Sequence, residues 1–495
     1  MAAERRERFV CRRSEPIFAA VERCLDNGVG ACFILDEDDL LLGSFSLGDA
    51  RRAIVDGLLT RVATLSDYLE EAGRPDAASH GAAPNDVMSA VIRPRLDERG
   101  RLVDVVVDRS RQRVQVAQPD LSHRELRGAL DAFLSTWISS QGERIRDFEN
   151  RFAAYIGSGF GVAVSNGTTA LHLALLALGI GPGDEVIVPD LTFAATVNAV
   201  LYCGATPVIV DIDPLRWTIA AAAVEEAVTP RTKAVIPVHL YGRPAEMTSL
   251  LAVARRHGLF VVEDCAEAHG ARYAGRSVGR FGDIACFSFF ANKIVTTGEG
   301  GMCLTDSQAL AARMRILRDH GMTPDRAYWH ERVGYNYRMT NLQAAIGLAQ
   351  LERIDETLDR NRRLQVLYHE HLGSIAGVEF PAALPSDSRP VVWLCCALVP
   401  AAARDALITA ARHEDIELRP FFHSISTMPP YQAYARDCPH SLALSRTGIA
   451  LPTSRAIDVP VIEKLNRLFR QVLGDASAVG DCAHESGSSV AFALS

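Results

Sequence analysis

The chain has 495 residues, enough for more than one domain with a sizeable buried core. Apolar residues make up 48% and charged residues 23% of it, as in ordinary soluble globular proteins, and no apolar run approaches the roughly 18 residues of a membrane span. The net charge of −8 argues against a general nucleic-acid-binding surface.

The 11 cysteines are scattered along the chain and include no C-x-x-C pair. Several of them, such as Cys32, Cys286 and Cys303, lie in apolar runs typical of buried strands. We therefore expect reduced core side chains rather than disulfides or metal ligands. The N-terminal segment lacks the apolar stretch of a signal peptide, so we expect a cytoplasmic protein that does not bind a membrane.

Residues 1–117 are predicted to form a separate α+β domain. The expected elements, in chain order, are a helix, two strands and a second helix: 17–25, 31–35, 40–45 and a helix starting at 48. This order resembles a CBS module, and Ser46 followed three residues later by Asp49 matches the ribose-contacting pattern of that family. These side chains either bind the ribose of an adenosyl ligand or cap the helix. Because CBS modules pair and only the end of a second copy is recognisable, at 90–105, the resemblance implies a shortened regulatory domain.

Residues 118–360 are predicted to form a large α/β domain. From about 158 to 305, short apolar strands alternate with helices, which is the pattern of a parallel sheet with crossover helices. In such sheets ligands bind outside the carboxyl ends of the strands. Polar and aromatic side chains that directly follow the strands are therefore the candidates for a binding site.

Three of these strand ends carry such candidates. Gly167, Thr168 and Thr169 open a helix, where free backbone N–H groups and hydroxyls either hold a phosphate or simply cap the helix. Phe193 follows the next strand and is either a core side chain or an aromatic plate for a planar ligand. Asp264 ends another buried strand, where a carboxylate either caps the following segment or contacts a ligand.

A lysine stands between two apolar strands predicted at 284–290 and 302–304. The glycines of the sequence TTGEGG, which precedes the second strand, allow tight backbone beside a ligand. Lys293 is either an ordinary lysine in a surface hairpin loop or an amine nucleophile whose pKa is lowered by burial.

Together these candidates match what pyridoxal 5′-phosphate (PLP) requires of a protein. Lys293 would form the Schiff base, and Asp264 would keep the pyridine nitrogen protonated so that the ring acts as an electron sink. Phe193 would cover one face of the ring, and the helix N-terminus at Gly167 and Thr168 would hold the phosphate. A metal or a dinucleotide needs no such set, and the chain contains no H-E-x-x-H, G-x-S-x-G or Walker pattern.

Residues 118 to about 473 resemble the DegT-type sugar-nucleotide aminotransferases, a fold-type-I PLP family. The matching stretches are SNGTTALHLAL (165–175), PDLTFAATVNAV (189–200), VHLYGRPAEM (238–247), VVEDCAEAHGA (261–271), CFSFFANKIVTTGEGGM (286–302) and NYRMTNLQAAIGLAQLERI (336–354). The resemblance implies a large domain with a parallel-rich sheet and a smaller α+β C-terminal domain. It also implies transamination, because a related dehydratase branch has histidine in place of Lys293.

The same resemblance implies roles for individual residues. Lys293 matches the Schiff-base lysine and Asp264 the partner of the pyridine nitrogen. The other cofactor contacts would be Gly167, Thr168, Thr169, Phe193, Glu267, Ser288 and Asn336. Glu267 stands where many members have glutamine beside the cofactor hydroxyl, and Asn336 would reach the phosphate from the neighbouring subunit. Arg338 matches the residue that binds the carboxylate of the amino donor, for which a planar guanidinium is suited. A homodimer with shared active sites is therefore implied.

The segment 318–337 looks most like that of GDP-perosamine synthases, which suggests a nucleotide-linked 4-keto-6-deoxy sugar as acceptor and glutamate as donor. The same residues could instead form a subunit-interface loop shared by several sugar specificities. A 3-keto sugar or a cyclitol ketone is the alternative acceptor, and the nucleotide (GDP, UDP or dTDP) stays open. A second class of function is a nucleotide-sensing regulatory protein, in which the N-terminal domain gates a weak catalytic domain.

Residues 361–474 are predicted to form the smaller C-terminal domain. Strands are expected at 391–399 and 416–420, the second leading to His423. His423 matches the substrate-side segment of the family and either contacts the sugar or donor or only closes the loop. Residues 475–495 are small and polar without periodicity, and we predict a disordered tail.

Overall fold

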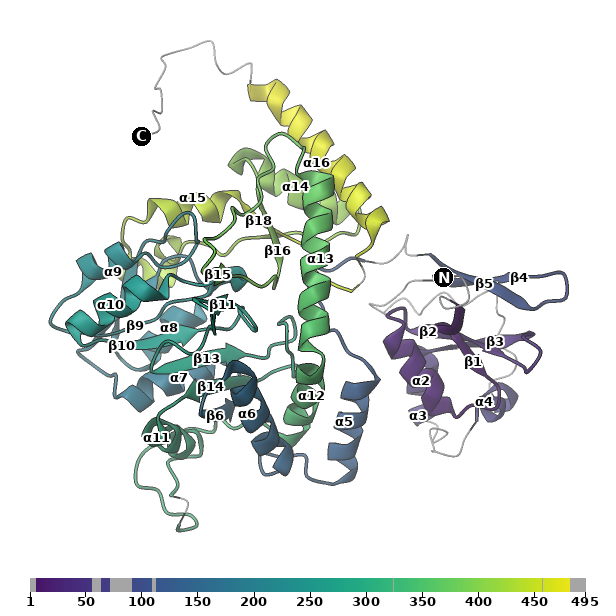
Figure 1. Cartoon of the computed structure of the whole chain (residues 1–495), viewed down its shortest axis with the longest axis horizontal. Helices are drawn as coiled ribbons and strands as arrows, with labels where there is room; N and C mark the ends of the chain where they lie inside the picture. The colour runs from purple at the N-terminus through teal and green to yellow at the C-terminus, as the bar shows by residue number, and fades with distance from the viewer. Residues whose placement is uncertain are drawn as a thin grey trace.

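Figure 1 shows the computed structural model of the chain, which describes residues 6–55, 64–71, 91–108, 113–323, 325–455 and 457–480. A small N-terminal domain, mostly purple, lies beside a larger body formed by the rest of the chain. None of the helices in these ranges is long and apolar enough to cross a membrane.

The large domain is built on a mixed sheet of seven strands. In spatial order they are β6 (Phe160–Val164), β14 (Gly301–Thr305), β13 (Ile284–Ser288), β10 (Phe260–Asp264), β9 (Thr232–Val235), β7 (Glu185–Pro189) and β8 (Thr206–Val210). Strand β14 runs antiparallel to both of its neighbours, and the other pairs of this sheet are parallel. β13 and β14 are joined by a loop without a crossover helix, so they pair antiparallel. The predicted parallel-rich sheet is confirmed, with one reversed strand.

Helices cover both faces of this sheet. One face packs against α7 (Gly167–Leu178), α8 (Ala195–Tyr202) and α11 (Gln308–Arg318). The opposite face packs against α6 (Glu143–Ile156), α12 (Asn341–Glu352), α9 (Ala221–Ala227) and α10 (Met247–His257). Along β13, Ile284 and Cys286 face the first layer, whereas Ala285 and Phe287 face the second. Burial on both faces explains why the strands read as continuous apolar runs.

The small domain is a three-stranded antiparallel sheet packed against helices. Its strands, in spatial order, are β16 (Cys395–Leu398), β18 (Gly448–Leu451) and β17 (Arg419–Pro420). Its main helices are α13 (Ile354–Leu372), α14 (Ala401–His413) and α16 (Val459–Gly480). Because α13 runs without a break from the large domain into the small one, the boundary predicted at residue 360 falls inside a helix. Val114 pairs with Ile416 and Val116 is fully buried in the main core, so this body begins before residue 118.

Shorter elements complete the body: α5 (His123–Leu134), η1 (Leu240–Gly242), β11 (Arg272–Tyr273), β12 (Arg276–Ser277), β15 (Ser388–Arg389), η2 (Ile425–Thr427), η3 (Pro429–Tyr434) and α15 (Pro439–Thr447). Helix α16 extends to Gly480, which lies within the segment for which a disordered tail is predicted. The helix packs through Ile462, Leu465 and Phe469 and continues into a segment with two alanines, which favour helix propagation. The rest of the predicted tail lies outside the described residues.

The N-terminal domain has the helix, strand, strand, helix order predicted from the sequence. Its elements are β1 (Val10–Arg12), α2 (Ile17–Asp26), β2 (Ala31–Leu35), β3 (Leu41–Ser46), α3 (Leu47–Val55), α4 (Leu65–Glu71), β4 (Val91–Leu96) and β5 (Leu102–Asp108). β2 pairs in parallel with β1 and antiparallel with β3, while β4 and β5 pair with each other. The domain contacts α5, where His123 Nδ1 lies 2.7 Å from Asp26 Oδ2 and Arg127 pairs with Glu22.

Candidate active site

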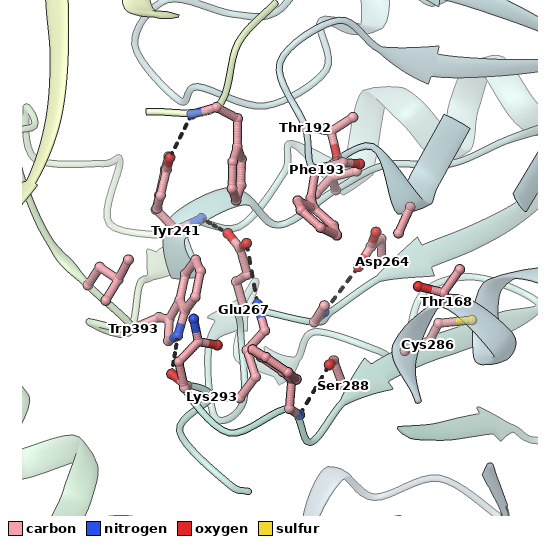
Figure 2. Close-up of a pocket in the computed structure, with 18 of the residues that line it drawn as sticks. Thr168, Thr192, Phe193, Tyr241, Asp264, Glu267, Cys286, Ser288, Lys293 and Trp393 are labelled. Atoms are coloured by element: carbon pink, nitrogen blue, oxygen red, sulfur yellow. Dashed lines mark hydrogen bonds and ion pairs between the residues drawn. The ribbon is translucent and has the colours of Figure 1, made fainter. Parts of the chain in front are cut away.

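A cavity of about 460 Å³ lies at the carboxyl ends of β10 and β13, between the large and small domains (Figure 2). Seven of the predicted site residues line it: Gly167, Thr168, Phe193, Asp264, Glu267, Ser288 and Lys293. Its volume is that of a pocket for a cofactor-sized molecule. The fold therefore brings together residues that lie more than 100 positions apart in the sequence, as Thr168 and Lys293 do.

The N-terminus of α7 forms one end of the cavity. The Asn166 side chain accepts the N–H of Thr169, and the Asn166 carbonyl accepts that of Ala170, which leaves the N–H groups of Gly167 and Thr168 for a ligand. A Cβ atom on Gly167 would lie 2.7 Å from Cβ of Ser288, so only glycine allows this close approach. Free N–H groups at a helix N-terminus beside a hydroxyl fit a phosphate group.

Thr169 serves the helix rather than the cavity. Its hydroxyl donates to the carbonyl of Asn166 and accepts the backbone N–H of the same residue, which closes a capping box. Thr169 is not among the residues that line the cavity. Of the three residues in this turn, Gly167 and Thr168 are the ones placed to contact a ligand.

Asp264 sits at the end of β10 and is almost fully buried. Its Oδ2 accepts a hydrogen bond from Oγ1 of Thr196 at 2.9 Å, and its Oδ1 accepts the N–H of Ala266 at 3.1 Å. Thr196 Oγ1 in turn lies 2.9 Å from Oγ1 of Thr192. Burial raises the pKa of Asp264, so a cationic group in the cavity would stabilise its ionised form. A protonated pyridine nitrogen is such a group.

Lys293 lies in the loop between β13 and β14, and its side chain is enclosed rather than solvated. Its Nζ is 3.5 Å from Oε1 of Glu267 and 3.8 Å from the centre of the Trp393 ring. Burial lowers the pKa of Lys293, against the opposing effect of Glu267 and Asp264. The alternative of a surface lysine in a hairpin loop is therefore wrong, because the small domain covers the loop.

Glu267 is the carboxylate next to the lysine amine. It accepts the backbone N–H of Tyr241 at 2.8 Å, and burial raises its pKa to about 6 in spite of the nearby Lys293. The pKa values of Lys293 and Glu267 thus both shift toward the neutral forms, because desolvation of this pair outweighs its mutual attraction. A neutral amine is the form that attacks a carbonyl carbon.

Phe193 is not a core side chain. It is 58% exposed, lines the cavity, and its ring centre is 5.6 Å from that of Phe422, which comes from the small domain. Its ring is therefore available to a planar ligand between α7 and the loop of Lys293.

Three other predicted site residues do not line this cavity. Arg338 and Asn336 lie on the segment that follows α11, where Arg338 pairs with Asp319 at 3.2 Å and its buried Nε has no hydrogen-bond partner among the described residues. His423 is exposed, and its neighbour Phe422 lines the cavity instead. These positions differ from those of the other candidates, which converge within one subunit.

In the N-terminal domain, Ser46 and Asp49 form a helix cap. The N–H and hydroxyl of Ser46 donate to Oδ2 of Asp49, at 2.8 and 2.7 Å, and the hydroxyl of Ser46 accepts the N–H of Asp49. Arg52 pairs with the other carboxylate oxygen. The structure shows the capping arrangement, which was one of the two sequence-based interpretations.

One group in the described part of the chain approaches the spacing of metal ligands: His239, Glu263 and Cys265, within 4.8 Å of one another. The Glu263 carboxylate already accepts three backbone N–H groups from the segment 279–282 and lies 3.1 Å from Nε2 of His239. His239 Nδ1 accepts the N–H of Ala245. Glu263 and His239 are therefore engaged with each other and with backbone N–H groups.

Several residues of the cavity were missed at the level of the sequence. Tyr241, Trp393 and Phe422 supply an aromatic wall, with the Tyr241 ring stacked on Phe422 and on Trp393 at 17° to each. Trp393 lies in a run that reads as a buried strand, so its indole gives no local sign of a role. Thr192 also lines the cavity, and its hydroxyl contacts that of Thr196 across the start of α8.

The cavity fits PLP by the chemistry of its side chains: an N-terminal turn for the phosphate, a buried carboxylate for the pyridine nitrogen, an exposed phenyl ring and a desolvated amine. Fold and site together define a PLP-dependent aminotransferase of fold type I. The chain belongs to the DegT/DnrJ/EryC1/StrS aminotransferase family, whose pattern matches residues 119–466.

Comparisons with known proteins agree with this assignment. The chain is 48% identical over 365 residues to a GDP-perosamine synthase of Caulobacter vibrioides, covering 73% of this chain and 98% of that protein. Its fold is similar to the aminotransferase TlmJ from Streptoalloteichus hindustanus, with a TM-score of 0.70 and 30% identity over 74% of this chain and all of that one. It is also similar to the PLP-form of Spr1654 from Streptococcus pneumoniae, with a TM-score of 0.69 and 26% identity over 73% and 98% of the two chains.

Proposed function

We propose that the chain transfers an amino group from glutamate to a nucleotide-linked 4-keto-6-deoxy sugar. The observation that carries the proposal is the desolvated amine of Lys293, in one cavity with Asp264 and the N-terminus of α7. The identity of 48% to a GDP-perosamine synthase across 73% of the chain supports the sugar class.

Each group of cavity residues has a separate role in this reaction. PLP, when bound, supplies the electron sink of the reaction. Gly167, Thr168 and Ser288 would hold its phosphate, and Asp264 would pair with its pyridine nitrogen. The amine of Lys293 would bond to the cofactor, and as a general acid/base it would hold or move a proton at Cα of the donor.

A second copy of the chain would complete the site. Asn336 and Arg338 lie outside the cavity of their own subunit, on a segment that also exposes Tyr328 and Val333 almost completely. An exposed apolar segment beside a poorly satisfied arginine is suited to a subunit interface. In the dimer, Arg338 would bind the carboxylate of the donor, and Asn336 would reach the phosphate across the interface.

The test is a half-reaction panel with the full-length protein. Glutamate converts the bound cofactor to its amine form, and absorbance then reports which keto sugar restores the original form. The panel contains GDP-, UDP- and dTDP-linked 4-keto-6-deoxy sugars, 3-keto sugars and a cyclitol ketone. Preferential turnover of a 3-keto sugar or cyclitol would contradict the proposal, and Lys293→Ala should abolish both the lysine-bound absorbance band and turnover.

The alternative function, a nucleotide-sensing regulatory protein, can be tested by measuring nucleotide binding to the N-terminal domain. The polar atoms of Ser46 and Asp49 are engaged with each other and with Arg52, so we expect no adenosyl nucleotide to bind there. Calorimetric titration with AMP and ATP measures this. Tight binding that Asp49→Asn removes, together with a change in turnover, would favour regulation.

A further inference from the structure

Trp393, a residue of the small domain, makes two contacts to the segment of the reactive lysine. Its indole N–H donates to the carbonyl of Asn292 at 2.7 Å, and its ring centre lies 3.8 Å from Nζ of Lys293 (Figure 2). Asn292 directly precedes Lys293 in the chain. One side chain therefore holds both the backbone of the loop and the amine at the end of the lysine.

The indole ring is itself rigidly held. It is 5% exposed and stacks on the ring of Tyr241 at 5.9 Å. The segment before it is joined to the large domain by the N–H of Val391, which donates to the carbonyl of Gly242 at 3.0 Å. A Cβ on Gly242 would lie 2.2 Å from the carbonyl oxygen of Val391, so glycine at this position permits the close approach.

The chemistry of the two neighbours of Nζ explains what this arrangement does. The face of an indole ring attracts an ammonium group, and the attraction grows when water is excluded. The second neighbour is Glu267, whose Oε1 lies 3.5 Å from the amine. A free lysine side chain is flexible, so an amine that must deliver a proton gains from two fixed neighbours that limit its positions.

We propose that Trp393 is a positioning residue for Lys293, which holds the amine at the cavity through its ring and the loop through its N–H. Through Trp393, the small domain therefore contributes to the position of the reactive amine. The proposal rests on the proposed role of Lys293 as the residue that bonds to the cofactor.

The test compares Trp393→Phe and Trp393→Leu with Trp217→Phe in the full-length protein. Trp217 is a matched control, because it is 3% exposed, lies in the same core and has a cation, Arg243, 4.8 Å from its ring. The first readout is the rate at which the lysine-bound absorbance band forms when PLP is added to cofactor-free protein, measured from neutral to alkaline pH. The second is kcat with glutamate.

Removal of the ring withdraws an interaction that favours the ammonium form, so Trp393→Leu should move the midpoint of the rate profile to lower pH, by about one unit. It should also lower kcat about tenfold. Trp393→Phe keeps an aromatic ring but has no N–H. The midpoint of its rate profile should therefore lie close to that of the parent protein, whereas kcat should stay reduced. Trp217→Phe should move neither.

An unchanged midpoint in both Trp393 variants, or an equal shift in Trp217→Phe, would overturn the proposal. If Trp393→Leu does not fold, the midpoint and kcat of Trp393→Phe decide the question. Failure of the underlying function is seen separately, because Lys293→Ala would then still form the absorbance band.

Discussion

Replacement of Asp264 by asparagine should affect stability and catalysis with opposite signs. The carboxylate is 5% exposed, and its burial raises its pKa, so the ionised form costs free energy in the cofactor-free protein. In Asp264→Asn the amide oxygen still accepts the N–H of Ala266, and the amide N–H donates to the hydroxyl of Thr196. We therefore expect the free energy of unfolding of the cofactor-free protein to rise by about 1–2 kcal/mol near neutral pH.

The pH dependence of this gain follows from the direction of the shift. A carboxyl group with a higher pKa in the folded state binds more protons there, so it lowers stability as pH rises between its unfolded and folded pKa values. The gain in Asp264→Asn should be absent below the unfolded pKa and complete above the folded one. Urea unfolding of the parent and the variant across this range measures it. A variant less stable than its parent near neutral pH would refute burial as the dominant influence.

If Asp264 pairs with the pyridine nitrogen of PLP as proposed, the same substitution removes that charge, and kcat should fall by about 10²–10³-fold. Asp190 provides a matched control. It also follows a strand of the sheet, is fully buried, has its pKa raised by burial and accepts hydrogen bonds from Ser424 and Ser426, but it does not line the cavity. Asp190→Asn should leave kcat within a few-fold of the parent, and an equal loss in both variants would contradict the role given to Asp264.

Three further outcomes are expected. Thr196→Val leaves an oxygen of Asp264 without its hydrogen bond, so chemical denaturation should show a loss of about 1–3 kcal/mol; no loss would mean that water replaces the hydroxyl. Burial disfavours the charge of Asp120, but three surrounding arginines outweigh it and lower its pKa, so its ion pairs stabilise the fold above the unfolded pKa and are lost as pH falls through the folded value. Asp120→Asn should flatten that acid dependence in pH-resolved thermal unfolding, and an unchanged profile would contradict it. Gly167→Ala places a methyl group 2.7 Å from Cβ of Ser288, so the affinity for PLP, measured by equilibrium dialysis, should fall at least tenfold, whereas Gly181→Ala, with open space around it, should not change it.

Local sequence patterns determined most of the strands and turns that carry the active-site residues. The apolar runs on either side of Lys293 are strands β13 and β14, and the Asn-Gly-Thr-Thr sequence opens α7 with a capping box. Asp264 ends β10 as predicted. These features depend on periodicity and capping within a few residues, which a sequence displays directly. The helix, strand, strand, helix order of the N-terminal domain was predicted for the same reason.

For residues whose environment depends on contacts between the two domains, only the tertiary structure decided between the alternative interpretations. Phe193 proved to be exposed to the cavity rather than buried in the core, and Lys293 to be covered by the small domain. The indole of Trp393 meets the carbonyl of Asn292 across 101 positions of the chain, and no local pattern signals such a contact. The pKa shifts of Lys293 and Glu267 likewise arise from desolvation, which exists only once distant segments have excluded water from the pair. The sequence by itself determined which groups are present and on which strands and turns they lie, whereas packing of the two domains determined their exposure, their charge and their neighbours.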